Sequence, residues 1–300
     1  MESKISVVIN TLNEQQSIAR VLESVKWADE IIVCDMHSTD QTVAVAKRMG
    51  AKVFLIKKAP FVELARNVSI AKATNEWVMV LDPDEEVPKT LATRLQEAAN
   101  NGGVTTFVEI PRKNIIFNKW VKASMWWPDY NIRFFKKGQV KWTNKIHIKP
   151  ETLGEGLKLE PEERFAITHH HYTSLDQFLT RLNRYTTIQA KELKESGYKF
   201  KWQDLIAKSL SEFLGRYFAN KGFEDGLHGL ALSLLQAFSF LIVYLKAWEL
   251  EKFPEQAVEL KELKNETKKV GFELDHWFKY SNLSSHPLKR FLQKAKNRVT

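Results

Sequence analysis

The sequence contains a single cysteine, Cys34, and this scarcity restricts both the scaffold and its environment. One thiol cannot form an intramolecular disulfide, so a disulfide-stabilised fold is excluded and a reducing compartment is expected. Cys34 follows the apolar run 31–33, which predicts a buried position in a core strand rather than a reactive thiol.

Several other features are absent. The sequence has no internal repeat, no low-complexity tract and no Gly-rich loop with a Walker lysine. We expect no signal peptide, because Lys4 leads directly into the apolar run 5–9. These absences argue against a repeat protein, a P-loop nucleotide-binding protein and a secreted protein.

The composition indicates a soluble chain with a basic balance. Hydrophobic residues make up 44% of the 300 residues, which is enough for a substantial core. The net charge of +9 suits anionic partners such as phosphates, nucleic acid or an acidic membrane face. Basic and aromatic residues are not interleaved in a recognised nucleic-acid-binding motif, so we expect no nucleic-acid partner.

The most informative stretch is the run 77–81 followed by Asp82 and Asp84. Five apolar residues in succession predict a strand buried on both faces. The two acids then stand at the carboxyl end of a strand, where open α/β sheets bind ligands, and carboxylates suit hard divalent cations. We predict that Asp82 and Asp84 bind Mg²⁺ or Mn²⁺. Glu85 and Glu86 are expected only to charge the first turn of the following helix.

The first half of the chain alternates between expected strands and helices. The expected elements, in order, are strand 5–9, helix 18–25, strand 30–35, helix 41–49, strand 51–56, helix 63–73 and strand 77–81. This alternation predicts an α/β fold with a parallel sheet and right-handed crossovers. Polar residues gather after the strands, where a nucleotide would lie.

Residues at these positions suit a nucleotide diphosphate. Asp35 is suited to accept hydrogen bonds from a base or ribose, and Asn13 and Glu14 to line the same edge. Arg66 is suited to bidentate contact with a diphosphate. Structural interpretations stay open: Asn13 as a helix cap, Arg66 as a solvated helix residue, and residues 38–40 as an N-cap set.

Four motifs in this region resemble those of glycosyltransferase family 2 in order and spacing. They are Thr11-Leu12-Asn13-Glu14, Asp35 with Ser38-Thr39-Asp40, Ala65-Arg66-Asn67 and Leu81-Asp82-Pro83-Asp84-Glu85. The similarity is closest to small members such as the lipopolysaccharide-core β-glucosyltransferases. It implies a GT-A fold, which is a Rossmann-like and mostly parallel sheet that binds nucleotide-diphosphate sugars.

The resemblance also implies roles for individual residues. The residues that would bind the donor are Thr11, Asn13, Glu14, Asp35, Arg66 and Asp82. Asp35 would contact the nucleoside, and Arg66 would lie near the diphosphate. Asp82 and Asp84 would form the metal motif, with His169 as a further ligand.

The chain departs from the family pattern at two places. Met36 and His37 stand where family members often carry Gly or Ser, which affects the fit of the ribose. Related sequences often have Val-His-Glu where this chain has Ile146-His147-Ile148, so an acid is missing there. His147 is then either a metal or phosphate ligand or a structural residue.

Inverting sugar transfer needs a base that takes the proton of the acceptor hydroxyl as its oxygen attacks the anomeric carbon. The candidates are Asp129 and Glu151, and we predict Asp129 as the catalytic base. The aromatic segment 118–133, which includes Trp126-Trp127-Pro128-Asp129-Tyr130, resembles the segment after the metal motif in the same small transferases. Its rings either stack on the acceptor sugar or pack over the sheet edge.

Three consecutive histidines, His169-His170-His171, stand on another expected strand. Because side chains alternate along a strand, at most two of them face one ion. No Cys/His pair at zinc spacing stands nearby, which argues against a structural zinc site. In the resembling family a histidine at this place lies near the diphosphate or the metal, which makes His169 the candidate.

The C-terminal region is expected to be helical, and we predict a transferase domain over 1–200 and a helical region over 201–300. The run 227–245 is uncharged. Three interpretations remain open: an interfacial or partly inserted hairpin, a soluble packing or dimerisation helix, and a membrane span. Basic residues before this run and in the tail beyond residue 288 fit an anionic membrane surface or a solvated helix face.

Together these observations predict an inverting, metal-dependent glycosyltransferase. It would transfer a hexose from a nucleotide-diphosphate sugar, most simply a UDP-sugar, to a cell-envelope glycan or lipid-linked acceptor at the cytoplasmic membrane face. The alternatives are a polyprenyl-phosphate sugar synthase, whose anionic acceptor needs no base, and a non-catalytic scaffold docked on the membrane. A sugar-nucleotide pyrophosphorylase is disfavoured, because the loop after the first strand lacks a Gly-rich basic cradle.

Overall fold

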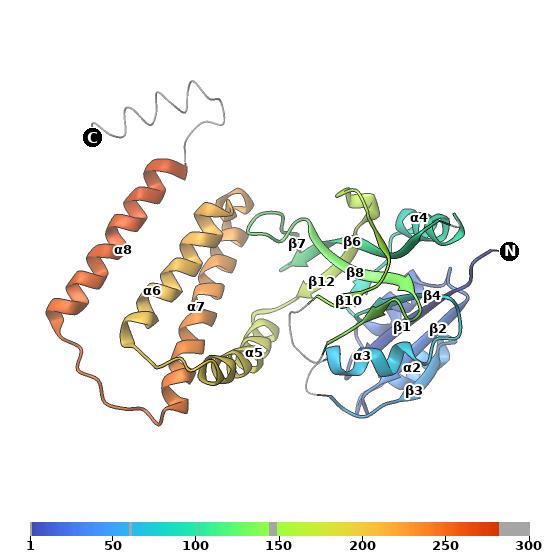
Figure 1. Cartoon of the computed structure of the whole chain (residues 1–300), viewed down its shortest axis with the longest axis horizontal. Coiled ribbons are helices and arrows are strands. Elements are labelled where there is room, and N and C mark those ends of the chain that lie inside the picture. The colour runs from blue at the N-terminus through green and yellow to red at the C-terminus, as the bar shows by residue number, and fades with distance from the viewer. Residues whose placement is uncertain (1, 60–61, 102, 144–148, 282–300) are drawn as a thin grey trace, which may run out of the picture. The chain divides into compact units, whose positions relative to one another are not determined.

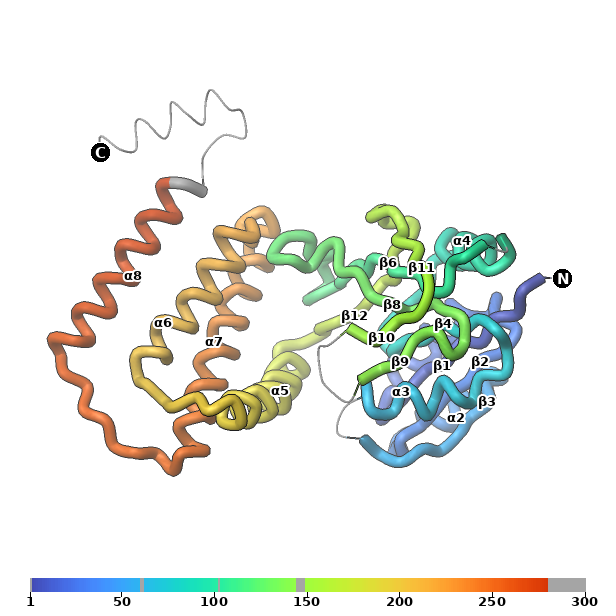
Figure 2. The backbone as a smooth tube through the Cα atoms, viewed as in Figure 1, coloured from blue at the N-terminus to red at the C-terminus, as the bar shows by residue number. Residues whose placement is uncertain are grey.

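The structure is a computed structural model that describes residues 2–59, 62–101, 103–143 and 149–281. The chain divides into two compact units, drawn in Figures 1 and 2. The first comprises Met1–Ile116 and Trp127–His171, and the second Phe117–Trp126 and Tyr172–Thr300. His147 and the basic tail beyond residue 288 lie outside the described residues.

The first unit is built on a mixed β-sheet. Its strands are β1 (Ile5–Thr11), β2 (Glu30–Asp35), β3 (Lys52–Leu55), β4 (Trp77–Leu81), β5 (Glu85–Glu86), β6 (Thr105–Ile116), β8 (Asp129–Lys136), β11 (Glu155–Lys158) and β12 (Ile167–Tyr172). The order is β3-β2-β1-β4-β8-β6-β12-β5, with β11 beside β6. Strands β3, β2, β1 and β4 are parallel, whereas β8 is antiparallel to both β4 and β6. The predicted α/β half is confirmed, and it continues into an antiparallel half.

Helices cover both faces of this sheet. They are α1 (Ile18–Ser24), α2 (Thr42–Arg48), α3 (Val62–Ile70) and α4 (Lys89–Asn100). Alternate residues of β1 enter two separate cores: Val7 and Ile9 pack with α1, α2 and α4, whereas Val8 packs with α3. Every residue of β1 and β4 is buried, as expected of strands covered on both sides. Each fully buried large apolar side chain contributes roughly 1.5–3 kcal/mol.

The β6–β8 pairing contains one irregularity. Val108 pairs with Phe134, but the next residue, Glu109, pairs with Ile132, so that Arg133 is an extra residue in β8. Such a bulge re-aims side chains and increases the local twist. A separate two-stranded sheet joins β9 (Val140–Lys141) to β10 (Glu151–Thr152).

Glu85 and Glu86 do not belong to a helix. They form β5, which pairs with β12, and α4 begins only at Lys89. The expectation that both acids merely charge the first turn of that helix was therefore wrong. The Glu85 side chain is completely buried and paired with Arg133. The spacing of apolar residues in the sequence does not reveal such a buried acid.

The second unit is helical. Its elements are β7 (Lys119–Trp120), α5 (Leu175–Glu195), α6 (Trp202–Leu214), α7 (Leu227–Leu250) and α8 (Leu260–Ser281), with π-helical and 3₁₀ turns at Gly215–Ala219 and Gly222–Asp225. Helix α7 packs against α5 and α6. It approaches the preceding turn so closely that a Cβ at Gly229 would lie 1.7 Å from the carbonyl oxygen of Gly222. Only glycine fits there.

Helix α7 is the one described helix long and apolar enough to cross a membrane by length and composition. Only 28% of its most apolar window is buried. We predicted a domain boundary at residue 200, and the structure places this position between α5 and α6, inside the second unit. The division at residue 200 stays a prediction.

Candidate active site

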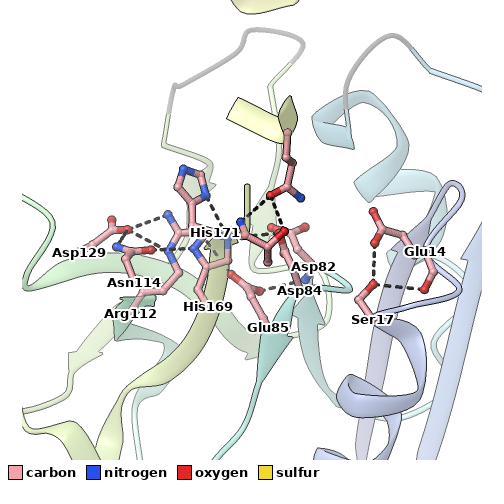
Figure 3. A network of polar contacts seen from close by, with 12 residues as sticks. Glu14, Ser17, Asp82, Asp84, Glu85, Arg112, Asn114, Asp129, His169 and His171 are labelled. Atoms are coloured by element: carbon pink, nitrogen blue, oxygen red, sulfur yellow. Dashed lines mark hydrogen bonds and ion pairs between the residues drawn. The ribbon is translucent and has the colours of Figure 1, made fainter. Parts of the chain in front are cut away.

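A network of charged and polar side chains lies at the carboxyl end of β4, on β5 and on the three neighbouring strands β8, β6 and β12 (Figure 3). Its members are Asp82, Asp84, Glu85, Arg112, Asn114, Asp129, Arg133 and His169. Strands β8, β6 and β12 are successive, so side chains at alternate positions on each of them meet on one face.

Asp82 is held by two arginines. Nη2 of Arg66 donates to its carboxylate oxygens at 2.8 and 3.1 Å, and Nη2 of Arg133 donates to Oδ2. Burial raises the pKa of Asp82, but the charges of Arg133 and Arg66 outweigh it and hold that pKa well below its usual range. Asp82 is therefore ionised at neutral pH, and Arg66 is a buried site residue rather than a solvated one.

Glu85 fixes the turn that carries Asp82. Its Oε1 accepts from Nη2 of Arg133 at 2.8 Å and from Nη1 of Arg112 at 3.3 Å. Its Oε2 accepts from the backbone N–H of Asp82 at 2.9 Å. A buried carboxylate without such partners would cost several kcal/mol. Glu85 is thus part of the framework that holds Asp82 in place.

Arg66 is itself supported by the segment after β9. Its guanidinium carbon lies 5.5 Å from the ring centroid of Trp142, within cation–π range. Asn67, the next residue of α3, donates to the Trp142 carbonyl at 2.8 Å and accepts from its N–H at 3.0 Å. Arg66 therefore contacts the ring of Trp142, and Asn67 binds the backbone of the same residue.

Asp129 is bound on both carboxylate oxygens. Oδ2 accepts from Nε and Nη2 of Arg112 at 2.9 and 2.7 Å and from Nδ2 of Asn114 at 3.1 Å. Oδ1 accepts from Nδ2 of Asn131 at 3.1 Å. Burial raises the pKa of Asp129, but Arg112, Asn114 and Asn131 lower it by a larger amount. The pKa of Asp129 therefore lies below its usual value.

This environment makes Asp129 an ionised but weakened base, because proton affinity falls with pKa. Its role as catalytic base stays a prediction. The alternative, Glu151, lies exposed on β10, paired with β9, and no contact described for it reaches Asp82 or Asp84.

Asp84 and His169 form the part of the network best suited to a cation. Nε2 of His169 lies 3.5 Å from Oδ2 of Asp84 and 3.3 Å from Nδ1 of His171. Two ligands at right angles on one Mg²⁺, each bound at about 2.1 Å, lie roughly 3 Å apart. The separation between Oδ2 of Asp84 and Nε2 of His169 is therefore close to that between two adjacent ligands of one ion.

His170 and Glu86 point away from Asp84 and His169. His170 faces Glu86, with its Nε2 2.5 Å from Oε1, so the predicted alternation along the histidine strand is confirmed. Among the described residues, no group of three or more His, Cys, Asp or Glu side chains is placed to hold one ion. A cation here would complete its shell with donor phosphate oxygens and water, as Mg²⁺ commonly does. The donor set fits such an ion.

The ends of β1 and β2 form a second polar cluster. Asp35 is completely buried, and its Oδ2 accepts from the hydroxyls of Thr11 and Ser38 at 2.9 and 2.6 Å. Asn13 donates its N–H to the Ser38 hydroxyl at 2.7 Å and accepts from the Thr39 N–H at 2.8 Å. Asn13 therefore joins two loops and does not cap α1, which begins at Ile18.

Two neighbouring acids are engaged within this cluster. The N–H of Glu14 donates to the Thr42 hydroxyl at 2.7 Å, and its carboxylate accepts from Ser17 at 2.6 Å (Figure 3). Asp40 accepts from the N–H of Thr42 at 2.9 Å, which satisfies one unpaired donor at the start of α2. Of the predicted cap set 38–40, Asp40 thus serves the helix, whereas Ser38 and Thr39 serve the loops.

The aromatic stretch is divided between the units. Trp120 and Trp126 belong to the second unit, and Trp127 and Tyr130 to the first. The Tyr130 hydroxyl donates to the carbonyl of Leu159 at 2.8 Å, which favours a packing role for this ring. An acceptor-stacking role for the tryptophans stays a hypothesis.

Four network residues, Glu85, Arg112, Asn114 and Arg133, were not anticipated as site residues. Three of them belong to strand segments in which every second residue is polar, and this alternation is the signal that the sequence offers. Polar residues alternate at Arg112 and Asn114 on one strand and at Asp129, Asn131 and Arg133 on its partner. Alternating polar residues on paired strands that are otherwise apolar predict a shared polar face.

The sequence profile of glycosyl transferase family 2 matches residues 6–154. An uncharacterized glycosyltransferase of Rickettsia typhi is 30% identical over 261 residues, which cover 82% of this chain and 87% of the relative. The lipopolysaccharide core biosynthesis glycosyltransferase LpsC of Rhizobium meliloti is 22% identical over 229 residues, covering 75% and 84%.

Among solved structures, this chain is similar to glucosyl-3-phosphoglycerate synthase of Mycobacterium tuberculosis in complex with Mn²⁺, UDP-glucose and phosphoglyceric acid. The match has 28% identity and a TM-score of 0.32, and it covers 36% of this chain and 43% of that one. The predicted α/β fold with a helical C-terminal part is confirmed, and its sheet is that of a GT-A domain. The chain belongs to glycosyl transferase family 2 and is a glycosyltransferase.

Proposed function

We propose that this enzyme is an inverting, metal-dependent hexosyltransferase that uses a nucleotide-diphosphate sugar, with a UDP-sugar as the first candidate. The observation that carries the proposal is the pairing of Asp84 and His169 at 3.5 Å, beside the arginine-bound Asp82. A bound Mg²⁺ or Mn²⁺ would act as a Lewis acid toward the departing diphosphate.

The residues of the chain supply the remaining functions. Arg66, paired to Asp82 in this structure, would bind the diphosphate through its charge and planar donors. Thr11, Asn13, Glu14 and Asp35 would hold the nucleoside end, because they organise the loops at the carboxyl edge of β1 and β2. Asp129 would take the proton of the acceptor hydroxyl.

The acceptor that we propose is a cell-envelope glycan or a lipid-linked saccharide. LpsC, by its name, acts in lipopolysaccharide core biosynthesis, and its match extends over most of both chains. The apolar surface of α7 supports a location at the inner face of the cell membrane, since Leu227, Leu234 and Phe238 are 77%, 53% and 42% exposed. Self-association through the C-terminal helices would use the same surface.

One observation favours a second candidate, a polyprenyl-phosphate sugar synthase. The lowered pKa of Asp129 and its pairing with Arg112 make it a weak base. An anionic phosphate acceptor attacks without losing a proton, and such a reaction needs no base. Replacing Asp129 with Asn would then leave turnover nearly unchanged. With a hydroxyl acceptor, the same change would lower turnover by about 10²–10⁴-fold.

A donor screen tests the proposal directly. Hydrolysis and transfer would be measured across nucleotide sugars with Mn²⁺, Mg²⁺ or chelator, and thermal shift would report binding. We expect a donor to stabilise the protein only when the cation is present. We expect this stabilisation to be lost in Asp84→Ala. Glu97→Gln, a change on the exposed face of α4, is the matched control. A folded protein that no donor stabilises with either cation would instead support the non-catalytic scaffold.

A further inference from the structure

Asn114 occupies the centre of the polar network. It lies on β6, between β8 and β12, and is completely buried. Its Nδ2 donates to Oδ2 of Asp129 at 3.1 Å, and its Oδ1 lies 2.7 Å from Nδ1 of His169. One amide side chain thus joins the candidate base on one neighbouring strand to the candidate metal ligand on the other.

The chemistry of the neighbours fixes the orientation of this amide. An ionised carboxylate only accepts hydrogen bonds, so the nitrogen of Asn114 must face Asp129. The amide oxygen is then directed to His169, and an amide oxygen cannot donate. Nδ1 of His169 must therefore carry the hydrogen.

The position of that hydrogen decides what the other ring nitrogen does. In a neutral imidazole with hydrogen on Nδ1, Nε2 carries a lone pair. Nε2 of His169 is the atom that faces Asp84 and His171, at 3.5 and 3.3 Å. A histidine binds a metal through such a lone pair, and the partner of its other nitrogen holds the ring in place.

We infer that Asn114 is a positioning residue that fixes His169 as the Nδ1–H tautomer, leaves Nε2 to bind the cation, and connects this ligand to Asp129. The inference rests on the proposed function in placing the cation between Asp84 and His169. A buried asparagine with a merely structural role would also be costly to remove, so protein stability alone does not test it.

The first experiment uses the unmodified full-length protein. Two-bond ¹⁵N–¹H correlation spectra of its histidine rings distinguish the Nδ1–H from the Nε2–H tautomer, and His169→Gln assigns the signal. We expect His169 to be the Nδ1–H tautomer without metal. An Nε2–H tautomer at His169 would overturn the inference.

The second experiment measures Mn²⁺ affinity by electron paramagnetic resonance in the absence of donor. Asn114→Ala removes the acceptor for His169, and we expect its Kd for Mn²⁺ to rise by roughly 10–100-fold. Asn114→Gln keeps an amide with both its donor and its acceptor, so in folded protein its Kd should lie closer to wild type than that of Asn114→Ala. Asn131→Ala is the matched control, because Asn131 bonds Asp129 without contacting His169.

The outcomes separate the two claims. Wild-type protein that binds no Mn²⁺ would overturn the proposed cation site and this inference together. Mn²⁺ binding that is equally tight in wild type and Asn114→Ala would overturn the inference alone. If Asn114→Ala does not fold, the tautomer measurement on the unmodified protein still tests the inference, because it requires no variant at this position.

Discussion

Arg112 on β6 lies directly opposite Asp129 on β8, and its guanidinium donates two hydrogen bonds to a single carboxylate oxygen. Removing this cation in Arg112→Met should raise the pKa of Asp129 toward its usual value. Because a base acts only when ionised, the acidic limb of kcat/KM against pH should move to higher pH by about one unit. Arg164→Met, on an exposed arginine, is the control. An unmoved acidic limb would argue that Asp129 is not the base.

Trp142 should influence donor binding without contacting the donor itself. Trp142→Leu removes the ring that lies against Arg66, and cation–π contacts are worth about 0.5–2 kcal/mol. We expect KM for the sugar nucleotide to rise about 3–10-fold. Trp142→Phe keeps an aromatic face and should change KM less than twofold. An equal donor KM in the two variants would show that the Trp142 ring does not position Arg66.

Glu30 should make stability depend on pH. Burial alone raises its pKa, but Lys52, Ser6 and Thr74 lower it to about 2. The carboxylate therefore stabilises the fold above pH 4.5, and that contribution is lost as pH falls from 4.5 toward 2. Urea unfolding should show Glu30→Gln less stable than wild type by on the order of 2 kcal/mol at pH 7, with the difference shrinking near pH 3. A gap that stays constant with pH contradicts this assignment.

Two glycines in the helical unit should respond to alanine in opposite directions. A Cβ at Gly229 would meet the Gly222 carbonyl at 1.7 Å, so Gly229→Ala should lower stability by about 3 kcal/mol or more. Among the described residues, no atom outside the neighbouring backbone of α8 lies within 4 Å of a Cβ at Gly271, so Gly271→Ala should stabilise by up to about 1 kcal/mol. Thermal unfolding of the two variants checks this contrast, and equal melting temperatures would refute it.

The exposed face of α7 should determine membrane binding. Leu234→Asn with Phe238→Asn removes two exposed apolar side chains, and we expect binding to anionic phospholipid vesicles to weaken at least tenfold in sedimentation assays. Both side chains are exposed, so the melting temperature should change little. Wild-type protein that does not sediment with vesicles, or a double variant that sediments equally well, would rule out this surface as the membrane contact.

Much of the fold followed from local patterns in the sequence. The buried strand β4 and the alternating strands and helices before it were visible because each element carries its own apolar periodicity. The antiparallel half was less visible. The strand β6 continues to Ile116 through polar residues, and it is held in the sheet by β8 and β12, which are distant in sequence.

The site was predicted in part for the same reason. Asp82 and Arg66 stand beside recognisable motifs, but their mutual ion pair depends on the packing of α3 against the sheet. Glu85 looks like a surface acid in the sequence and becomes a buried one only because Arg112 and Arg133 arrive from other strands. His37 adopts a left-handed backbone with φ of 63°, a conformation that glycine adopts without strain.

The extra residue in β8, Arg133, has a consequence for how one strand serves two environments. Side chains alternate along a strand, and one inserted residue reverses their phase. Before the insertion, Asp129 pairs with Arg112 and carries its side chain into the polar network; after it, Phe134 and Phe135 enter the two apolar interiors. Deleting a single residue from this strand would therefore misdirect either the polar side chains of the network or the phenylalanines, so both environments constrain its length.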